Sequence, residues 1–257
     1  KRRRTGRWNT ASWIQDFGVC FWENQWKERM TAVKIGMLVA VDVDAVFKEY
    51  GDSLTRIEKP GYEIYHYKVD DADIYALSSG AGEIAAAAGT QLLITEFQVD
   101  VIVNFGVVGG LTPEMGVTRT CVVEKVVHYD FDTSPVDHCE VGRYLDYPEV
   151  YIPATPELVE KALRIEPTLK KVACASGDKF IADPEKKRAL HEQFGADICE
   201  MEAAAIVLTC NRNQVPCLLL KTVSDSIHGG AEEFNRALDE TAGICLKITE
   251  RIIREGL

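Results

Sequence analysis

Apolar and polar positions along the chain follow two patterns, one typical of buried strands and one of helices. Nearly continuous apolar runs lie at residues 33–41, 99–104 and 216–223, with further strand-like runs at 62–69, 73–78, 121–127 and 171–176. Helices are expected at 45–50, 84–97, 156–163, 184–194, 203–209 and 232–254, with a polar turn at 211–214. Strands without alternation are typical of the doubly covered parallel sheet of an α/β protein.

Length and composition narrow the class of protein. With 257 residues and 46% hydrophobic residues, the chain fits one large α/β domain or two small ones and can bury a sizeable core. Its apolar runs fall far short of the ~20 residues of a membrane helix. The net charge of −11 argues against a general nucleic-acid binder, which would carry a basic face.

The first 29 residues differ from the rest. They hold all four tryptophans and a net charge of +4, so the remainder carries −15. No apolar core of a secretory signal is present in them. A basic aromatic arm for nucleic acid or a membrane surface is one interpretation. We favour the other, a non-native or disordered extension before a domain at 30–257, because Met30 leads directly into the first predicted strand.

The eight cysteines show neither a C-x-x-C pair nor a metal-ligand spacing. Several of them fall within apolar runs, as buried free thiols do. This usage predicts a reducing, cytoplasmic setting without structural disulfides and without a metal site.

Two acids in the stretch 199–230 are candidates for chemistry. Asp225 ends an apolar strand, where α/β sheets bind ligands, and Glu202 stands at the mouth of the preceding helix. Each alone has a structural interpretation, as a helix cap or a first-turn acid. Together, near one predicted cleft, they favour a functional interpretation. Asp42 and Asp44 likewise follow a buried strand, and for Asp42 we favour helix capping.

Two glycine-rich segments add weaker signals. The loop 78–83 offers backbone N–H groups at a helix N-terminus, which is a natural anion site, but it lacks the dinucleotide-binding spacing. In Phe105–Leu111, three glycines allow the backbone to approach a ligand or another strand closely.

The motif Glu200-Met201-Glu202-Ala203-Ala204-Ala205-Ile206, followed by an apolar strand into Ser224-Asp225, resembles the signature of the nucleoside phosphorylase superfamily. Within it, the 5'-methylthioadenosine/S-adenosylhomocysteine nucleosidases are the most similar branch, over almost all of 33–257. The resemblance implies one α/β domain with a twisted mixed central sheet flanked by helices. It also implies hydrolysis of a purine nucleoside with release of adenine, a homodimer, a place in methionine salvage, and no metal or organic cofactor.

The resemblance also assigns roles to residues. Asp225 would protonate the departing purine at N7, with Ser224 orienting it, and Asp44 would activate water. Glu202 would bind the ribose hydroxyls while Met201 packs on the sugar. The remaining predicted substrate contacts are Ser79 at the water site, Gly106 under base and sugar, Phe180 stacked on the purine, Ile181 at the base edge, and Glu200 and Lys221.

Some residues depart from the family pattern. Asp44 replaces a glutamate, and Lys221 replaces an arginine and loses its bidentate fork. Asn104 stands where phosphorylases hold phosphate with arginine, which favours water as the nucleophile. The 5' pocket has Val41, but the loop 226–233 is short and polar where the family has a phenylalanine. The sequence therefore leaves the 5' substituent open, including futalosine-type substrates.

Three functions remain in competition. The preferred one is a purine nucleoside hydrolase. A phosphate-dependent phosphorylase on the same fold is the second. A non-catalytic nucleoside-binding protein is the third, kept open by the substitutions at Asp44 and Lys221.

Overall fold

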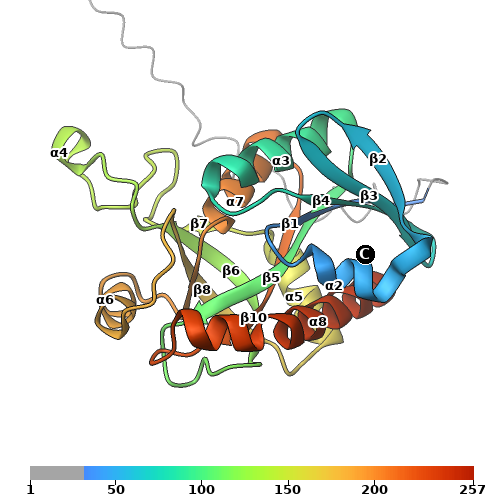
Figure 1. Cartoon of the computed structure of the whole chain (residues 1–257). Coiled ribbons are helices and arrows are strands. Elements are labelled where there is room, and N and C mark those ends of the chain that lie inside the picture. Colours follow the sequence, from blue (N-terminus) through green and yellow to red (C-terminus); the bar gives the residue numbers. More distant parts are fainter. Residues whose placement is uncertain (1–31) are drawn as a thin grey trace, which may run out of the picture.

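The computed structural model describes residues 32–257. The predictions for the extension at 1–29 lie outside the described residues. Within them, a mixed ten-stranded sheet forms the centre of the molecule (Figure 1). Its strands are β1 (Lys34–Val39), β2 (Thr55–Lys59), β3 (Tyr62–Val69), β4 (Ala72–Ser78), β5 (Val101–Gly110), β6 (Thr120–His128), β7 (Ile152–Pro153), β8 (Lys170–Ser176), β9 (Ile198–Glu200) and β10 (Cys217–Asp225).

The sheet closes on itself at one end. Strands β10, β6, β8, β9 and β5 are hydrogen-bonded in that order, and β10 pairs again with β5, so the five form a ring. Strands β1, β4, β3 and β2 extend the sheet from β5. The pairs β1–β4, β1–β5 and β5–β10 are parallel, so these strands bring their carboxyl ends to one edge. The prediction of a single α/β domain with a mixed central sheet is confirmed.

Burial explains why the apolar runs became strands. All nine residues of β10 are buried, and nine of the ten in β5 are. Strand β5 continues through Gly106 to Gly110, where the sequence had suggested a separate glycine segment after residue 104. A Cβ atom at Gly110 would lie 2.0 Å from the backbone oxygen of Met115, so this strand end requires glycine.

Helices cover both faces of the sheet. Helices α3 (Glu83–Glu96) and α7 (Ala203–Asn213) pack together on one face, while α2 (Val43–Tyr50), α5 (Pro156–Ile165) and α8 (Ala231–Gly256) cover the other (Figure 1). Helix α6 (Pro184–Phe194) lies beside the ring, and the short α4 (Ser134–Asp137) projects outward (Figure 1). A 3-10 turn follows α2 at Gly51–Ser53.

Helix α7 is longer than predicted. The polar residues 211–213, expected to form a turn, are the last residues of the helix. There the Asn213 side chain donates to the Thr209 carbonyl at 2.8 Å. Gln214 then ends the helix in the left-handed region, with φ of 56°. The short strands β2 and β9 were also not predicted, since five and three residues carry too little pattern.

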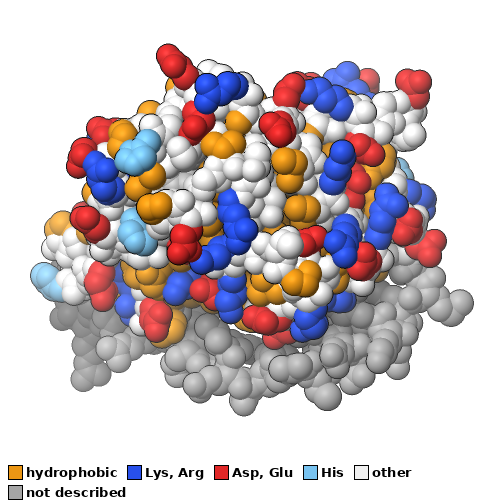
Figure 2. Space-filling model, turned by 90° about the horizontal axis from the view of Figure 1, so that it is seen from below, with side chains coloured by type: hydrophobic (Ala, Val, Ile, Leu, Met, Phe, Trp, Pro, Cys, Tyr) orange, Lys and Arg blue, Asp and Glu red, His pale blue; other side chains and the backbone are white. Residues whose placement is uncertain are grey.

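The described surface is charged, and the cysteines beneath it are mostly buried. The face seen in Figure 2 intersperses acidic and basic side chains. None of the helices in residues 32–257 is long and apolar enough to cross a membrane. The seven cysteines in this range are free thiols, and all but Cys139 are buried.

Candidate active site

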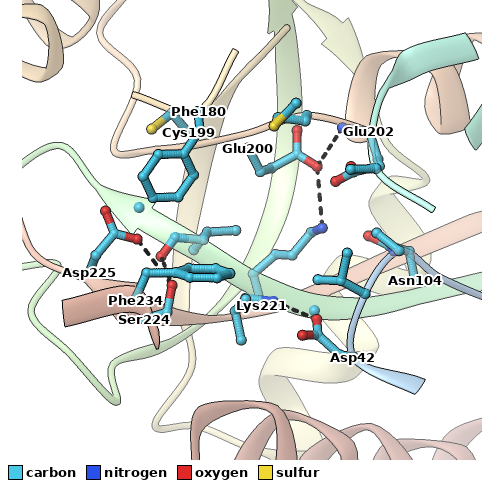
Figure 3. Close-up of a pocket in the computed structure, with 18 of the residues that line it drawn as sticks. Asp42, Asn104, Phe180, Cys199, Glu200, Glu202, Lys221, Ser224, Asp225 and Phe234 are labelled. Carbon is cyan, nitrogen blue, oxygen red and sulfur yellow. Dashed lines mark hydrogen bonds and ion pairs between the residues drawn. The ribbon is translucent and has the colours of Figure 1, made fainter. Parts of the chain in front are cut away.

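A pocket of about 180 Å³ lies where the carboxyl ends of β1 and β10 meet strand β5. The loop after β1, the β9–α7 junction and the start of α8 complete its wall (Figure 3). Asp225 and Asp42 stand at opposite ends of this pocket, with Lys221 between them (Figure 3). Eight of the residues predicted from the sequence line it: Gly106, Phe180, Glu200, Met201, Glu202, Lys221, Ser224 and Asp225.

The N-terminus of α7 positions the two glutamates of the EME motif. Glu200, the last residue of β9, accepts hydrogen bonds from the backbone N–H groups of Glu202 (3.0 Å) and Ala203 (2.9 Å). The next two N–H groups, of Ala204 and Ala205, donate to Ser176 and to Glu83. Three side chains thus satisfy four N–H groups at the open end of the helix, and the motif is fixed where it enters the pocket.

Glu202 occupies the N-cap position of α7 but does not cap that helix. Its Oε1 instead accepts from the Gly82 N–H at 2.8 Å, and Asp178 Oδ1 accepts from the Glu83 N–H at 2.8 Å. The loop predicted as an anion site therefore already has two protein carboxylates on its N–H groups. Burial first, and then the charge of Glu200, raise the pKa of Glu202 to about 7.

Asp225 ends β10 and is 1% exposed. The register with β5 shifts between Val223 and Asp225, an irregularity of the kind that re-aims side chains at functional sites. Both carboxylate oxygens have partners: Ser224 Oγ donates to Oδ1 at 3.1 Å, and Lys187 Nζ donates to Oδ2 at 2.5 Å. Helix α8 begins at Ala231 with Gly230 at the cap position, so Asp225 is not a helix cap.

Lys221 is a buried cation in the middle of the pocket wall, 2% exposed. Its Nζ lies 3.3 Å from Glu200 Oε2. Burial alone would lower the pKa of Lys221, but the charges of Glu200 and Glu202 outweigh it and raise the pKa. The ammonium group therefore stays charged beside the two glutamates.

Asp42, rather than Asp44, reaches the pocket. Asp42 is 4% exposed, and its Oδ2 accepts from the Val107 N–H at 3.2 Å, while its Oδ1 has no hydrogen-bond partner among the described residues. It occupies the N-cap position of α2, as predicted, but its side chain makes no capping hydrogen bond there. Asp44 lies one residue into α2, is exposed, and does not line the pocket. The difference follows from the helix start, since residues two apart on a helix face different sides.

The surroundings of Asp42 alter its acidity. Burial raises the pKa of Asp42 to about 6, although the Val107 hydrogen bond and the charge of Lys221 act in the opposite direction. Asn104, in β5, lines the same wall and also has a buried Oδ1 without a hydrogen-bond partner in the described chain. Its amide group donates to the Leu38 carbonyl at 2.9 Å. This end of the pocket thus holds two buried acceptor oxygens that have no hydrogen-bond partner among the described residues, near the Lys221 cation.

Aromatic rings close the other side. Phe180 is 47% exposed, and its ring meets that of Phe234 edge-on at 5.4 Å. Ile181 contributes to a small adjoining hollow next to Asp225. Phe234, on α8, shows that the polar loop at 226–233 is followed at once by an aromatic side chain in the pocket wall. The expectation that this pocket lacks a phenylalanine after the aspartate is therefore wrong.

Ser79 lies outside the pocket lining. Its hydroxyl donates to the carbonyl of Gly80 at 2.8 Å, and its backbone N–H donates to the Val39 carbonyl. In this arrangement Ser79 joins the ends of β4 and β1. Its contact with substrate or water stays a prediction.

Lys187 was missed by the sequence reasoning, although a signal was present. Lys187, Leu190 and Phe194 follow the spacing of a buried helix face, and all three are buried. A lysine at such a position is unusual and indicates a buried partner. As to metals, no group of three or more potential ligands comes together within residues 32–257.

Comparison with known proteins gives consistent results. A sequence profile described as "Phosphorylase superfamily" matches residues 34–254. A 5'-methylthioadenosine/S-adenosylhomocysteine nucleosidase of Hydrogenovibrio crunogenus is 34% identical over 190 residues, covering 71% of this chain and 81% of that protein.

Two solved structures have the same fold. Futalosine hydrolase of Helicobacter pylori superposes with a TM-score of 0.81 at 25% identity, covering 87% of this chain and 98% of that one. The 5'-methylthioadenosine/S-adenosylhomocysteine nucleosidase of the same organism also gives 0.81 at 25% identity, covering 88% and 99%. With a family profile spanning the described domain almost from end to end, this chain belongs to the phosphorylase superfamily.

Proposed function

We propose that the protein is an N-glycosyl hydrolase that cleaves adenine nucleosides such as 5'-methylthioadenosine or S-adenosylhomocysteine and releases adenine. The observation that carries the proposal is the placement of two buried carboxylates, Asp225 and Asp42, at opposite ends of one pocket. Glycoside hydrolysis needs an acid for the leaving group and a base for water on the opposite face of the sugar.

Asp225 protonates the leaving base. A purine anion leaves poorly, so the C1'–N9 bond breaks as the Asp225 carboxyl passes its proton to N7, and the bond's electron pair stays with the purine. Phe180, half exposed at the pocket edge, offers its ring for stacking on the base. Glu202 accepts hydrogen bonds from the ribose hydroxyls, and Met201 lines the sugar region.

Asp42 activates the attacking water, which is the role that the family resemblance assigns to Asp44. Asp42 Oδ1, which has no partner among the described residues, accepts one proton from water. The oxygen of that water molecule forms the new bond to C1'. Asn104 Oδ1 accepts the second hydrogen and orients the water. The charge of Lys221 favours the ionised form of Asp42. A base with a pKa of about 6 is well matched to work near neutral pH.

Two contacts favour water over phosphate. The N–H groups of the loop before α3 already donate to Glu202 and Asp178, so a phosphate there would meet two carboxylates. The cation nearest the water end, Lys221, is engaged by Glu200 at 3.3 Å. A phosphate dianion needs unengaged cationic donors, and arginine forks are the usual ones.

An apolar 5' substituent fits the outer pocket. Val41 is 50% exposed there, and Phe234 lines the same pocket. Such a surface suits a methylthio or a larger thioether group better than a charged one. Futalosine is the second candidate substrate, because futalosine hydrolase superposes as well as the methylthioadenosine enzyme does.

We also propose that the chain works as a homodimer in the cytoplasm. Among residues 32–257, three large apolar side chains are more than 60% exposed, namely Ile84, Val136 and Leu145. Ile84 lies in the first turn of α3, next to the pocket, where a second copy would shield it. The buried free thiols suit a reducing compartment.

A substrate panel tests the activity. Purified protein is incubated with 5'-methylthioadenosine, S-adenosylhomocysteine, futalosine, adenosine and inosine, with and without phosphate, and free base is measured. We expect adenine from the thioether nucleosides at a rate independent of phosphate, and free sugar rather than sugar 1-phosphate. Base release that requires phosphate would identify a phosphorylase, and binding without release a non-catalytic protein.

A further inference from the structure

Lys187 is a fully buried cation that the proposed mechanism has not used. Its side chain is 0% exposed and its Nζ lies 2.5 Å from Asp225 Oδ2. The same ammonium group donates to the Ser226 carbonyl at 2.7 Å and lies within 3.5 Å of the carbonyls of Asp225 and Gly229. An ammonium group is costly to bury, so this position demands the full set of oxygen partners that it has.

The partners of Lys187 belong to the acid and to the turn that follows it. Helix α6, which carries Lys187, comes directly after the loop with Phe180 and Ile181. The turn after Asp225 is held from its other side by Glu233, whose Oε2 accepts from the N–H and the hydroxyl of Ser226. Lys187 therefore links helix α6, which follows the loop with Phe180 and Ile181, to Asp225 at the end of β10.

A role in stability alone explains this arrangement poorly. Buried ion pairs contribute little net stability compared with apolar residues of similar volume. The neighbouring positions of Lys187 on the buried face of α6 are the apolar Leu190 and Phe194. A charged residue at this position is better explained by what it does to its partner.

We propose that Lys187 is a positioning residue for the proton donor, an inference that rests on the proposed function. It fixes the Asp225 carboxyl at the base end of the pocket. Asp225 takes up a proton from solvent when substrate binds and passes it to N7. The positive charge of Lys187 then stabilises the carboxylate that remains, while Lys187 itself keeps all three of its protons. Such a preorganised charge, placed where negative charge develops, lowers the barrier of the step.

Two substrates with different leaving groups test this role. Adenine must be protonated as it departs from 5'-methylthioadenosine, whereas nitrophenolate leaves 4-nitrophenyl β-D-ribofuranoside without a proton. We expect Lys187→Met to lower kcat for the adenine nucleoside about 100-fold, within the range of general acid catalysis, with little change in KM. The same variant should hydrolyse the nitrophenyl riboside within about 3-fold of wild type. Lys187→Arg, which keeps the charge, should recover most of the lost rate.

A double-mutant cycle and melting temperatures complete the test. Because Lys187 acts through Asp225, Lys187→Met combined with Asp225→Asn should be no slower than Asp225→Asn alone. Equal losses on both substrates, additive losses in the cycle, or an unchanged adenine rate in Lys187→Met would each overturn the inference. If Lys187→Met does not fold, Lys187→Gln and Lys187→Arg are compared in the same way. Full activity in Asp225→Asn would instead overturn the proposed function itself.

Discussion

The two ends of the pocket hold the same kind of side chain in opposite surroundings. Asp225 and Asp42 are both less than 5% exposed; Asp225 is the last residue of β10, and Asp42 lies just after β1. Asp225 has partners on both oxygens, from Ser224 and from Lys187. Asp42 has one backbone partner, and its second oxygen is free.

This difference shows how one residue type serves two tasks. A carboxylate buried with few partners holds its proton to higher pH, and Asp42 follows this rule with a pKa raised by burial to about 6. Its Oδ1 is buried without a hydrogen-bond partner among the described residues, and we propose that it accepts from the attacking water. A carboxyl fixed by two side chains is instead a rigid donor whose position is set before substrate arrives. Residue type alone therefore does not decide which carboxyl group is held by two side chains and which keeps an oxygen without a partner.

The largest effect is expected at the base end. Asp225→Asn keeps the shape and the Ser224 contact but cannot deliver the proton, so kcat for 5'-methylthioadenosine should fall about 100- to 10,000-fold. Adenine release is followed by chromatography. Asp183→Asn, in the exposed cap of α6, is the matched control and should retain its rate. An Asp225→Asn protein with more than a tenth of the wild-type rate would remove this end from the mechanism.

The water end is tested by a pair of neighbouring substitutions. Asp42→Asn removes the proposed base and should lower kcat about 100-fold, whereas Asp44→Asn, on the exposed side of α2, should stay within about 2-fold. Both rates come from the same adenine assay. The reverse order of effects would restore Asp44 as the base and show that α2 rearranges when substrate binds.

The pH dependence sharpens the assignment of Asp42. A base must be unprotonated to act, so kcat/KM should fall as pH decreases through about 6, reaching about a tenth of its plateau one unit below. Glu202, whose pKa burial raises to about 7, should broaden this acid limb upward. Steady-state rates between pH 4.5 and 8.5 give the profile. In Asp42→Asn the inflection near 6 should disappear, and its persistence would assign it to another group.

Glu83 is a buried carboxylate that lies at neither end of the pocket. Burial raises its pKa to about 8, while Ser176 and the Ala205 N–H donate to it. The folded state therefore binds a proton more tightly than the unfolded chain, and the stability associated with Glu83 declines as pH rises from about 4.5 to 8.

Glu83→Gln removes this pH-dependent cost. The variant should be more stable than wild type by about 1–3 kcal/mol at pH 9 and equal to it near pH 5, with kcat within about 3-fold. Urea unfolding at the two pH values measures the difference in free energy of unfolding. A large loss of kcat with unchanged stability would place Glu83 in the chemistry.

Much of the fold could be predicted because burial leaves a direct trace in sequence. The apolar runs of β1, β5 and β10 are covered on both faces, and their carboxyl ends marked the pocket edge. The motif at Glu200–Glu202 and the strand-end Asp225 were found in the same way. These polar residues stand where an apolar strand ends or a helix begins, so the hydrophobic pattern indicates their positions.

The remaining features depend on distant contacts that local patterns do not record. Whether Asp42 or Asp44 faces the pocket depends on where α2 begins, and the Asp42 side chain is held there by the distant Val107 N–H on β5. Glu202 bonds Gly82, 120 residues away. Closure of the ring between β10 and β5 rests on pairing that no single run of residues displays.

The division of work between the two ends has one direct test. Adenine release from 5'-methylthioadenosine is measured for Asp42→Ala, Asp44→Ala and Asp225→Asn with and without sodium azide, and the sugar product is identified by mass spectrometry. An anionic nucleophile needs no base but still needs the acid. Azide should therefore restore Asp42→Ala, with a glycosyl azide as product, and leave Asp225→Asn slow. Rescue of Asp225→Asn, or rescue of Asp44→Ala in place of Asp42→Ala, would contradict the account.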